Sequence, residues 1–465
     1  MVAAPDLTLT LTPPGGSPAQ YQHLLAYEGH DSPFTIAQNF GRQGDTAVLP
    51  LADDYSGGSP ALPYVQPMTL VSLYDGNCGQ VLFAGVCHDP LMTVVSPRRN
   101  DWTLNCTDYT YYADNAIVHG VFNGLTADQV IIGLTNQADC GISAARRDGG
   151  GFVADGPAMA NLVLNYGSLS SAWRKLAVLA GASTPYGWYV DENRALHFYD
   201  ATTALDSGVT FTAIPTTGGS TTQGHMLDGS SNTYEWDGTS VHNRILVQGG
   251  TQTIPQPVGG ASTATDTWRA DGTQQAWPLR YTVSGTPTLH VGGVRQPVTV
   301  VTPGTAFPSS GWSLQQNAFG GFFLWKHHPA PPAGTLLQTW YSYSVPVVAQ
   351  ATDHASVARY AGPNGGIFAE FISDTTLTTA PMALSRAQQE RTEYAFAAER
   401  ASFTTAEDFL GWVRAGQVFR YVNPYVPDSQ NSWAPGISDT FLAVANTVTF
   451  GKGGYRQMAV TGVRI

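Results

Sequence analysis

The chain has 465 residues and a net charge of −12, and only 12% of its residues are charged, against about 25% in an average soluble domain. Its 43% hydrophobic content excludes intrinsic disorder, which needs few apolar residues and many charges. The chain is also too long for one ordinary core, so we expect three or four domains.

The composition favours a mainly β protein, because glycine, threonine and aromatic residues are abundant. The scarcity of charge excludes a coiled coil. No run of 18 apolar residues predicts a transmembrane helix, and residues 1–10 lack the pattern of a secretory signal. The four cysteines show no CxxC spacing and are interpreted as buried or idle thiols in a reducing compartment: Cys78, Cys87, Cys106 and Cys140.

Residues 1–106 are expected to form a small β-sheet or barrel. Residues 7–12 alternate apolar and polar side chains, as a strand with one buried face does. A hairpin is predicted over 68–87, because Asp75-Gly76 is a strong turn signal. Further strands are expected at 23–29, 32–40 and 101–109.

Residues 107–205 are predicted to be an α+β module. Thr126 and Gln129 have the spacing of a capping box, followed by apolar residues at helical intervals. A second helix is expected to begin at Ser170 or Ser171 and to end at Gly181. Strands at 187–190 and 195–198 flank a predicted turn.

Two further regions complete the predicted organisation. Residues 206–262 and 346–465 are expected to form a second β domain, with a helix over 383–401 and strands at 243–250, 417–422, 441–451 and 454–465. Residues 263–345 are expected to be a peripheral inserted β domain, with short strands at 279–283, 288–293, 298–301, 322–326 and 336–345. The overall fold class is therefore mainly β with α+β portions.

The sequence contains no GxSxG, HExxH, P-loop or dinucleotide-binding motif. The glycines of 148–152 are interpreted as a turn. His327 and His328 are adjacent, so on a strand they face opposite ways and are poor ligands for one metal ion. The same geometry disfavours Cys87 and His88 as a nucleophile and its base.

Two pairs of carboxylates lie next to one another, Asp53-Asp54 and Glu407-Asp408. A glycosidase needs two carboxylates facing each other about 5–9.5 Å apart, which neighbours do not provide. We interpret them as solvated loop acids and as the first turn of a helix. The many Trp and Tyr residues could form sugar-binding platforms, but their alternation with apolar residues favours core positions. No catalytic, cofactor-binding or metal-binding residue is therefore predicted, no cofactor is expected, and the chain is not predicted to be an enzyme.

The order of the segments is more informative than any single motif. A β domain ending in Cys-Thr-Asp-Tyr (106–109) precedes a helix containing Ala-Asp-Gln-Val-Ile (127–131) and a helix with a hairpin over 170–200. A strand at 243–250, a segment at 322–346 and a helix with a strand over 386–422 follow. In this order the chain resembles the tail tip or baseplate hub proteins of long-tailed bacteriophages.

The resemblance implies a homotrimer that closes the tail tube. Two tube-like β-barrel domains in each chain, 1–106 and 206–262 with 346–465, would give six in the trimer and match a sixfold tube to a threefold tip. The implied partners are a distal tail protein ring above, a tip fibre or spike below, and the tape-measure protein in the lumen, with DNA only in transit. The implied location is the virion tail tip, assembled in the host cytoplasm.

The alternative is a β-rich tail protein that binds or cleaves polysaccharide. The net charge of −12 disfavours electrostatic gripping of nucleic acid. It fits an acidic or neutral lumen wall, and it fits equally well a charge that merely aids solubility.

Overall fold

A computed structural model describes the chain except for residues 1–5, 22–24, 26–32, 42–43, 56–61, 63–64, 123, 160–161, 182–185, 215–219, 228–231, 257–264, 302–307, 317–320, 362–364, 407–408, 430–433 and 452–454. The fold is mainly β with a few helices, as the sequence predicted. It divides into two compact units. Unit 1 comprises Met1–Ile245, Gln350–Glu370 and Ser385–Ile465, and unit 2 comprises Leu246–Ala349 and Phe371–Leu384.

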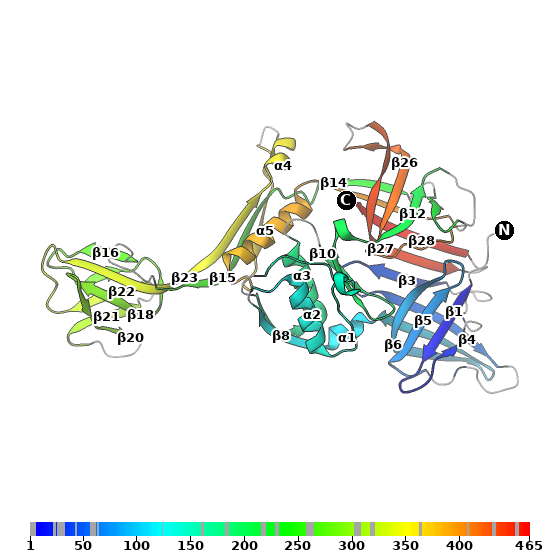
Figure 1. The fold of residues 1–465 in the computed structure, drawn as a ribbon, viewed down its shortest axis with the longest axis horizontal. Helices are drawn as coiled ribbons and strands as arrows, with labels where there is room; N and C mark the ends of the chain where they lie inside the picture. Colours follow the sequence, from blue (N-terminus) through cyan, green and yellow to red (C-terminus); the bar gives the residue numbers. More distant parts are fainter. Residues whose placement is uncertain are drawn as a thin grey trace. The chain divides into compact units, whose positions relative to one another are not determined.

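The N-terminal strands of unit 1 form one stretch of a 14-stranded sheet, in the order β3-β4-β7-β6-β5-β1-β2 (Figure 1). Alternate side chains are buried, as with Leu7, Leu9 and Leu11, which confirms the expected strand at 7–12. The predicted 68–87 hairpin is also confirmed, although its second strand continues to Ser96. The strands are β1 (Leu7–Thr12), β2 (Ala19–Gln20), β3 (Phe34–Asn39), β4 (Thr46–Asp54), β5 (Thr69–Asp75), β6 (Gln80–Ser96) and β7 (Arg99–Asp108).

The C-terminal strands of unit 1 continue the same sheet. β27 (Ala434–Gly451) pairs with β26 (Val418–Asp428), with β28 (Tyr455–Arg464) and with β3. The β27–β3 pairing joins the strands of both β domains expected from the sequence into one sheet. The remaining strands are β12 (Asp206–Thr212), β13 (Gln223–His225), β14 (Thr233–Asp237) and β25 (Ala398–Thr404).

The α+β module of unit 1 forms largely as its local signals predict. The capping box at α2 (Ala127–Ala138) is confirmed, with the Thr126 amide donating to Gln129 Oε1 at 3.0 Å. The expected cap of α3 (Leu169–Ala180) is wrong by two or three residues: Ser168 caps the helix, because Ser170 is buried and bonds to Asp114. The other elements are α1 (Thr110–Asn115), β8 (Ile117–Phe122), β9 (Leu162–Ser168), β10 (Tyr186–Val190), β11 (Leu196–Asp200) and two short 3-10 turns, Arg147–Gly149 and Ala201–Thr203.

Unit 2 contains residues 263–345 of the predicted insert together with neighbouring segments. Two sheets enclose a core that includes Trp277, Leu289, Trp312 and Tyr341. The two strands expected at 279–283 and 288–293 are in fact one strand, β18 (Thr282–Val291), with an irregularity after Ser284. The other strands of these sheets are β15 (Arg244–Ile254), β16 (Asp266–Arg269), β17 (Ala276–Pro278), β19 (Val294–Gln296), β20 (Val298–Val301), β21 (Gly311–Gln316), β22 (Phe322–His327), β23 (Leu336–Thr352) and β24 (Ala369–Ser373).

The expected helix over 383–401 is partly wrong. Helix α5 runs over Ala380–Tyr394, and Ala398–Thr404 forms β25 instead. Ala401 and Phe403 are buried there, and β25 pairs with both β14 and β28. Pairing and burial thus outweigh the helix propensity of the segment. A short helix, α4 (His354–Arg359), lies before α5 in the chain.

Of the strand expected at 23–29, all but Leu25 lies outside the described residues. Within the described part of the chain, no helix is long and apolar enough to cross a membrane.

Strands β15 and β23 are neighbours in one sheet, so the chain enters and leaves the 263–345 segment at adjacent places. We therefore predict that replacing residues 265–343 with a short Gly/Ser linker leaves unit 1 folded. Circular dichroism and thermal unfolding of the deletion variant would test this. A deletion variant that fails to fold would show that the segment belongs to the main core.

Candidate assembly interface

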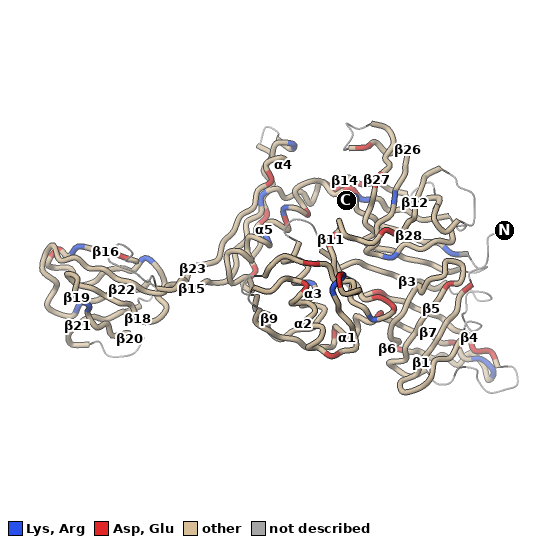
Figure 2. Tube along the Cα trace, in the orientation of Figure 1, with Lys and Arg blue, Asp and Glu red and all other residues tan. Residues whose placement is uncertain are grey.

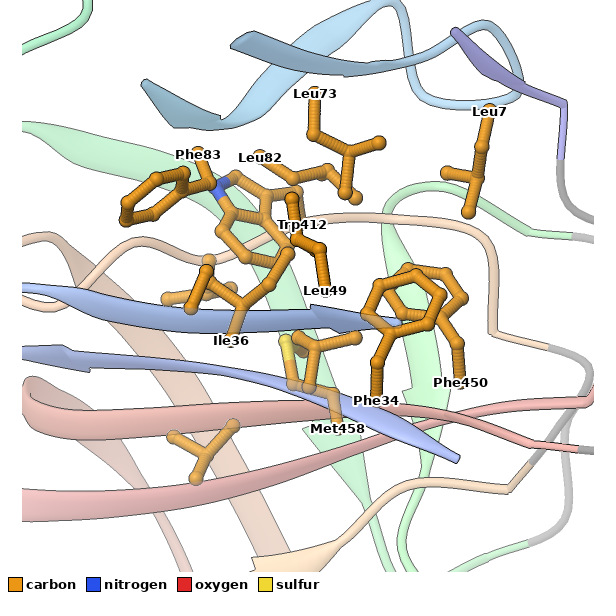
Figure 3. Packing of buried hydrophobic residues seen from close by; sticks show 14 of the residues in the cluster. Leu7, Phe34, Ile36, Leu49, Leu73, Leu82, Phe83, Trp412, Phe450 and Met458 are labelled. Atoms are coloured by element: carbon orange, nitrogen blue, oxygen red, sulfur yellow. The ribbon is translucent and has the colours of Figure 1, made fainter. Parts of the chain in front are cut away.

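The loop over 409–417, between β25 and β26, inserts into the core of unit 1. Trp412 is buried, and Figure 3 shows its indole beside Leu73 and Leu82 of the N-terminal strands. Below it, Phe34 of β3 stacks on Phe450 of β27, with ring centroids 4.7 Å apart. Side chains of the N-terminal and C-terminal strands therefore share one core.

A buried ion pair connects β28 to β5. Arg456 Nη1 lies 3.1 Å from Asp75 Oδ2, and both side chains are almost fully buried. Arg456 also donates to the carbonyls of Leu410 and Gly411 and lies over the Trp412 ring. Burial raises the pKa of Asp75 and lowers that of Arg456, each against the attraction of its partner. One guanidinium thus joins the loop, the last strand and the N-terminal hairpin.

A second arginine connects the loop to the α+β module. Arg414 Nη2 donates to Asp45 Oδ2 at 3.0 Å and to the Val190 carbonyl at 3.1 Å. At the same junction, Tyr199 Oη donates to the Gly416 carbonyl at 2.6 Å. Gly416 has a φ of +95°, and a Cβ there would collide with Tyr199 and with Phe40, so this position requires glycine.

Two carboxyl groups lie at this junction. Asp45 precedes β4 and Asp108 ends β7, and the Asp108 amide donates to the Asp45 carbonyl at 2.9 Å. Burial, and secondly the neighbouring Asp45, raise the pKa of Asp108 to about 7. Asp108 accepts hydrogen bonds from the amide and hydroxyl of Thr110, at the start of α1. The Asp108 carboxyl is therefore partly protonated at neutral pH.

An aromatic stack extends from Arg414 into the α+β module. The guanidinium lies 4.6 Å from the Tyr189 ring centroid, and Tyr189 stacks on His197 at 4.2 Å. His197 stacks in turn on Phe152 at 4.0 Å, and its Nε2 lies 3.1 Å from Asp191 Oδ2. Burial lowers the pKa of His197 despite the neighbouring carboxylate, so the ring is neutral at pH 7.

A third buried arginine joins the ends of four strands. Arg464 of β28 makes ion pairs with Glu399 of β25, Asp428 of β26 and Asp439 of β27, at 2.9, 2.9 and 2.6 Å. Tyr234 of β14 donates to Glu399 at 2.6 Å. Like the first two arginines, Arg464 acts here as a structural connector.

One cavity of about 350 Å³ lies in the α+β module. Its lining includes Arg147, Asp148, Asp155 and Asp200. Arg147 donates to the Thr203 carbonyl, and the Asp200 carboxylate accepts from the Thr203 amide. Both groups are therefore used by the local backbone.

Two uncharged apolar surfaces are exposed on unit 1. The first, the edge patch, consists of Leu91, Met92, Val94 and Val95 in the outer half of β6, exposed by 57, 44, 66 and 52%. The second, the hairpin patch, consists of Ile117 and Val121 of β8 and Tyr166 of β9, exposed by 63, 77 and 78%. Exposed apolar surfaces of this kind mark contacts with other molecules. These patches are the candidate interface.

The structure separates the residue pairs that the sequence drew attention to. His327 Nε2 lies 2.9 Å from Ser313 Oγ, whereas His328 contacts Gln275. Cys87 is buried opposite Cys106, whereas His88 is exposed. Among the described residues, no group of three His, Cys, Asp or Glu side chains lies close enough to hold a metal ion.

Other interpretations from the sequence have mixed outcomes. Asp53 is not a solvated loop acid, because it is buried at the end of β4 and accepts from the Leu62 amide at 2.9 Å. Glu407 and Asp408 lie outside the described residues. The glycines of 148–152 do form a turn, with Gly150 at a φ of +80°. All four cysteines are free thiols. Core positions are confirmed for seven tryptophans: Trp102, Trp173, Trp188, Trp277, Trp312, Trp340 and Trp412.

The whole fold is similar to that of solved tail proteins. The 43 kDa tail protein of prophage MuSo2 from Shewanella oneidensis is 11% identical, with a TM-score of 0.54 over 99% of this chain and 98% of that one. The tail protein from Neisseria meningitidis MC58 is 9% identical, with a TM-score of 0.52 over 98% and 96%. No protein-family model and no curated protein matches the sequence. The chain therefore has the fold of phage tail proteins, which confirms the resemblance at the level of the fold.

The Arg456–Asp75 pair generates a stability prediction. Arg456→Met leaves the Asp75 carboxylate and two backbone carbonyls without their donor, so we expect a loss of about 3–5 kcal/mol. Urea unfolding measures this loss. Arg99→Met, which breaks a half-exposed pair with Asp101, is the control and should cost below about 1 kcal/mol. Equal losses in the two variants would contradict the role given to Arg456.

The Asp108 carboxyl generates a pH prediction. Its folded-state pKa of about 7 lies above the ordinary value of 3.8, so the folded state keeps a proton that the unfolded state loses. The contribution of this group to stability is therefore largest below about pH 4 and falls as pH rises towards 7. We expect Asp108→Asn to flatten the decline of the unfolding midpoint across this window. A slope identical to that of the parent protein would show that the carboxyl is ionised in the fold.

Proposed function

We propose that this chain is a structural protein of the virion, the hub at the distal end of a long phage tail. The observation that carries the proposal is the match of the fold to tail proteins along nearly the full length of both chains. The buried charged groups described above fit a structural role. Arg414, Arg456 and Arg464 all bind segments of the same chain to one another.

The hub is proposed to be a homotrimer that closes the tail tube. Each chain supplies an N-terminal and a C-terminal set of strands within one sheet, so three chains supply six sets. A ring of this kind adapts a sixfold tube to a threefold tip. The proposed neighbours are a distal tail protein ring above and a tip fibre or spike below, with the tape-measure protein in the lumen.

DNA is proposed to pass through the ring without being held. Duplex DNA carries one negative charge per about 1.7 Å of its axis, so a basic channel would bind it by releasing counterions. The chain has 34 acidic residues against 22 basic ones, and Figure 2 shows basic positions scattered among acidic ones. An acidic or neutral lumen wall is consistent with this distribution.

The oligomeric state tests the proposal. Light scattering of the purified protein at high concentration should give a mass of three times 49.5 kDa. If the trimer is stable only within the assembled particle, cross-linking of intact tails should still detect it. A monomer both in the purified protein and in intact tails would contradict the hub proposal.

A further inference from the structure

The edge patch is an open strand edge. Residues 80–87 of β6 pair with β5 on one side. On the other side, β6 pairs with β7 from Gly85 onwards. Beyond Cys87, only the pairing with β7 continues. Among the described strands, none pairs with the second edge of residues 89–96. An edge with unpaired backbone groups is a template for a further strand.

Apolar side chains emerge from both faces of this edge. Met92 is opposite Trp102 and shares its face, whereas Leu91 is opposite Thr103 on the other face. A strand that only covered its own core would expose polar residues on one face. Both faces of this strand therefore suit contact with another molecule.

The hairpin patch is also open, but it is a sheet surface. β8 and β9 form a two-stranded sheet whose buried side chains, such as Val118 and Leu164, face inward, and β8 lies against α2 and α3. On the outer face, His119 stacks on Tyr166 with ring centroids 4.6 Å apart. Each strand has one unpaired edge among the described strands. Sheets of two strands are marginal, and a third strand stabilises them.

Neither patch contains a charged residue. Residues 90–97, 116–125 and 158–168 contain no Asp, Glu, Lys or Arg. Burying these side chains against each other therefore removes no charged side chain of the patches themselves from water, and the charges beside the edge patch, Arg99 and Asp101, pair with one another. In the view of Figure 1, β8 and β6 lie on either side of α1, so the patches are separate surfaces of unit 1.

A closed ring with threefold symmetry requires two different surfaces on every subunit, because its contacts are head to tail. Resting on the hub proposal, we propose that the edge patch of one copy binds the hairpin patch of the next copy. The outer half of β6 adds as a strand to the β8–β9 sheet, and Leu91 or Met92 packs against Val121 and Tyr166. The occupant of each patch is thus a second copy of this chain.

Two charged variants separate the halves of this contact. The edge variant carries Leu91→Lys and Val94→Lys, and the hairpin variant carries Val121→Lys and Tyr166→Lys. A control variant carries Val294→Lys and Tyr425→Lys, at positions exposed by 63 and 78% outside both patches. Circular dichroism and an unchanged unfolding midpoint verify that each variant is folded.

We expect each patch variant alone to be a monomer of 49.5 kDa, and the control to remain a trimer. An equimolar mixture of the two patch variants should form a dimer of twice that mass, because one intact edge patch and one intact hairpin patch remain. No larger species should form, since the ring cannot close.

Several results would overturn the inference. If the hairpin variant still forms trimers, the edge patch has another occupant. Folded monomers that fail to form a dimer on mixing would show that the patches do not bind each other. If the parent protein and both variants are all trimers, this contact is wrong while the hub proposal stands. A parent protein that is monomeric even within tails removes the hub proposal itself.

Discussion

Unit 1 depends on the pairing of β27 with β3. This ladder of six residue pairs, from Ala445–Asn39 to Phe450–Phe34, joins strands from the two ends of the chain into one sheet. The ladder alone would leave two sets of strands free to twist about it. The 409–417 loop prevents this, because Trp412 fills the space between the N-terminal and C-terminal side chains. Backbone pairing thus sets the topology of the sheet, and the packing of the loop fixes the angle between the two sets of strands.

The buried arginines extend the same principle to the α+β module. Arg456 binds the start of the 409–417 loop and pairs with Asp75. Arg414, within the loop, pairs with Asp45. A buried ion pair adds little net stability compared with a hydrophobic pair of equal volume. It is, however, strongly directional, because a displaced carboxylate leaves a buried charge uncompensated. The two pairs therefore hold the N-terminal strands, the loop and the α+β module in one defined arrangement.

Local signals in the sequence predicted much of the fold. Alternation revealed β1, the Asp75-Gly76 turn placed a hairpin, and Thr126 with Gln129 marked the start of α2. The 398–401 segment was mistaken for helix, because its propensity is local whereas its pairing with β14 and β28 is not. Nothing local distinguishes Arg456 from an exposed arginine. Likewise, nothing in the sequence shows that the mostly apolar segment 91–95 is exposed, because its composition is that of a core strand.

The separation of Asp75 from Arg456 has a consequence for how the chain matures. The two residues are 381 positions apart, and translation at about 5–20 residues per second takes about 20–80 s to cover that interval. During this time the N-terminal strands are outside the ribosome without β27, β28 or Trp412 to cover them. The shared core of unit 1 can therefore close only after the C-terminal strands have been made.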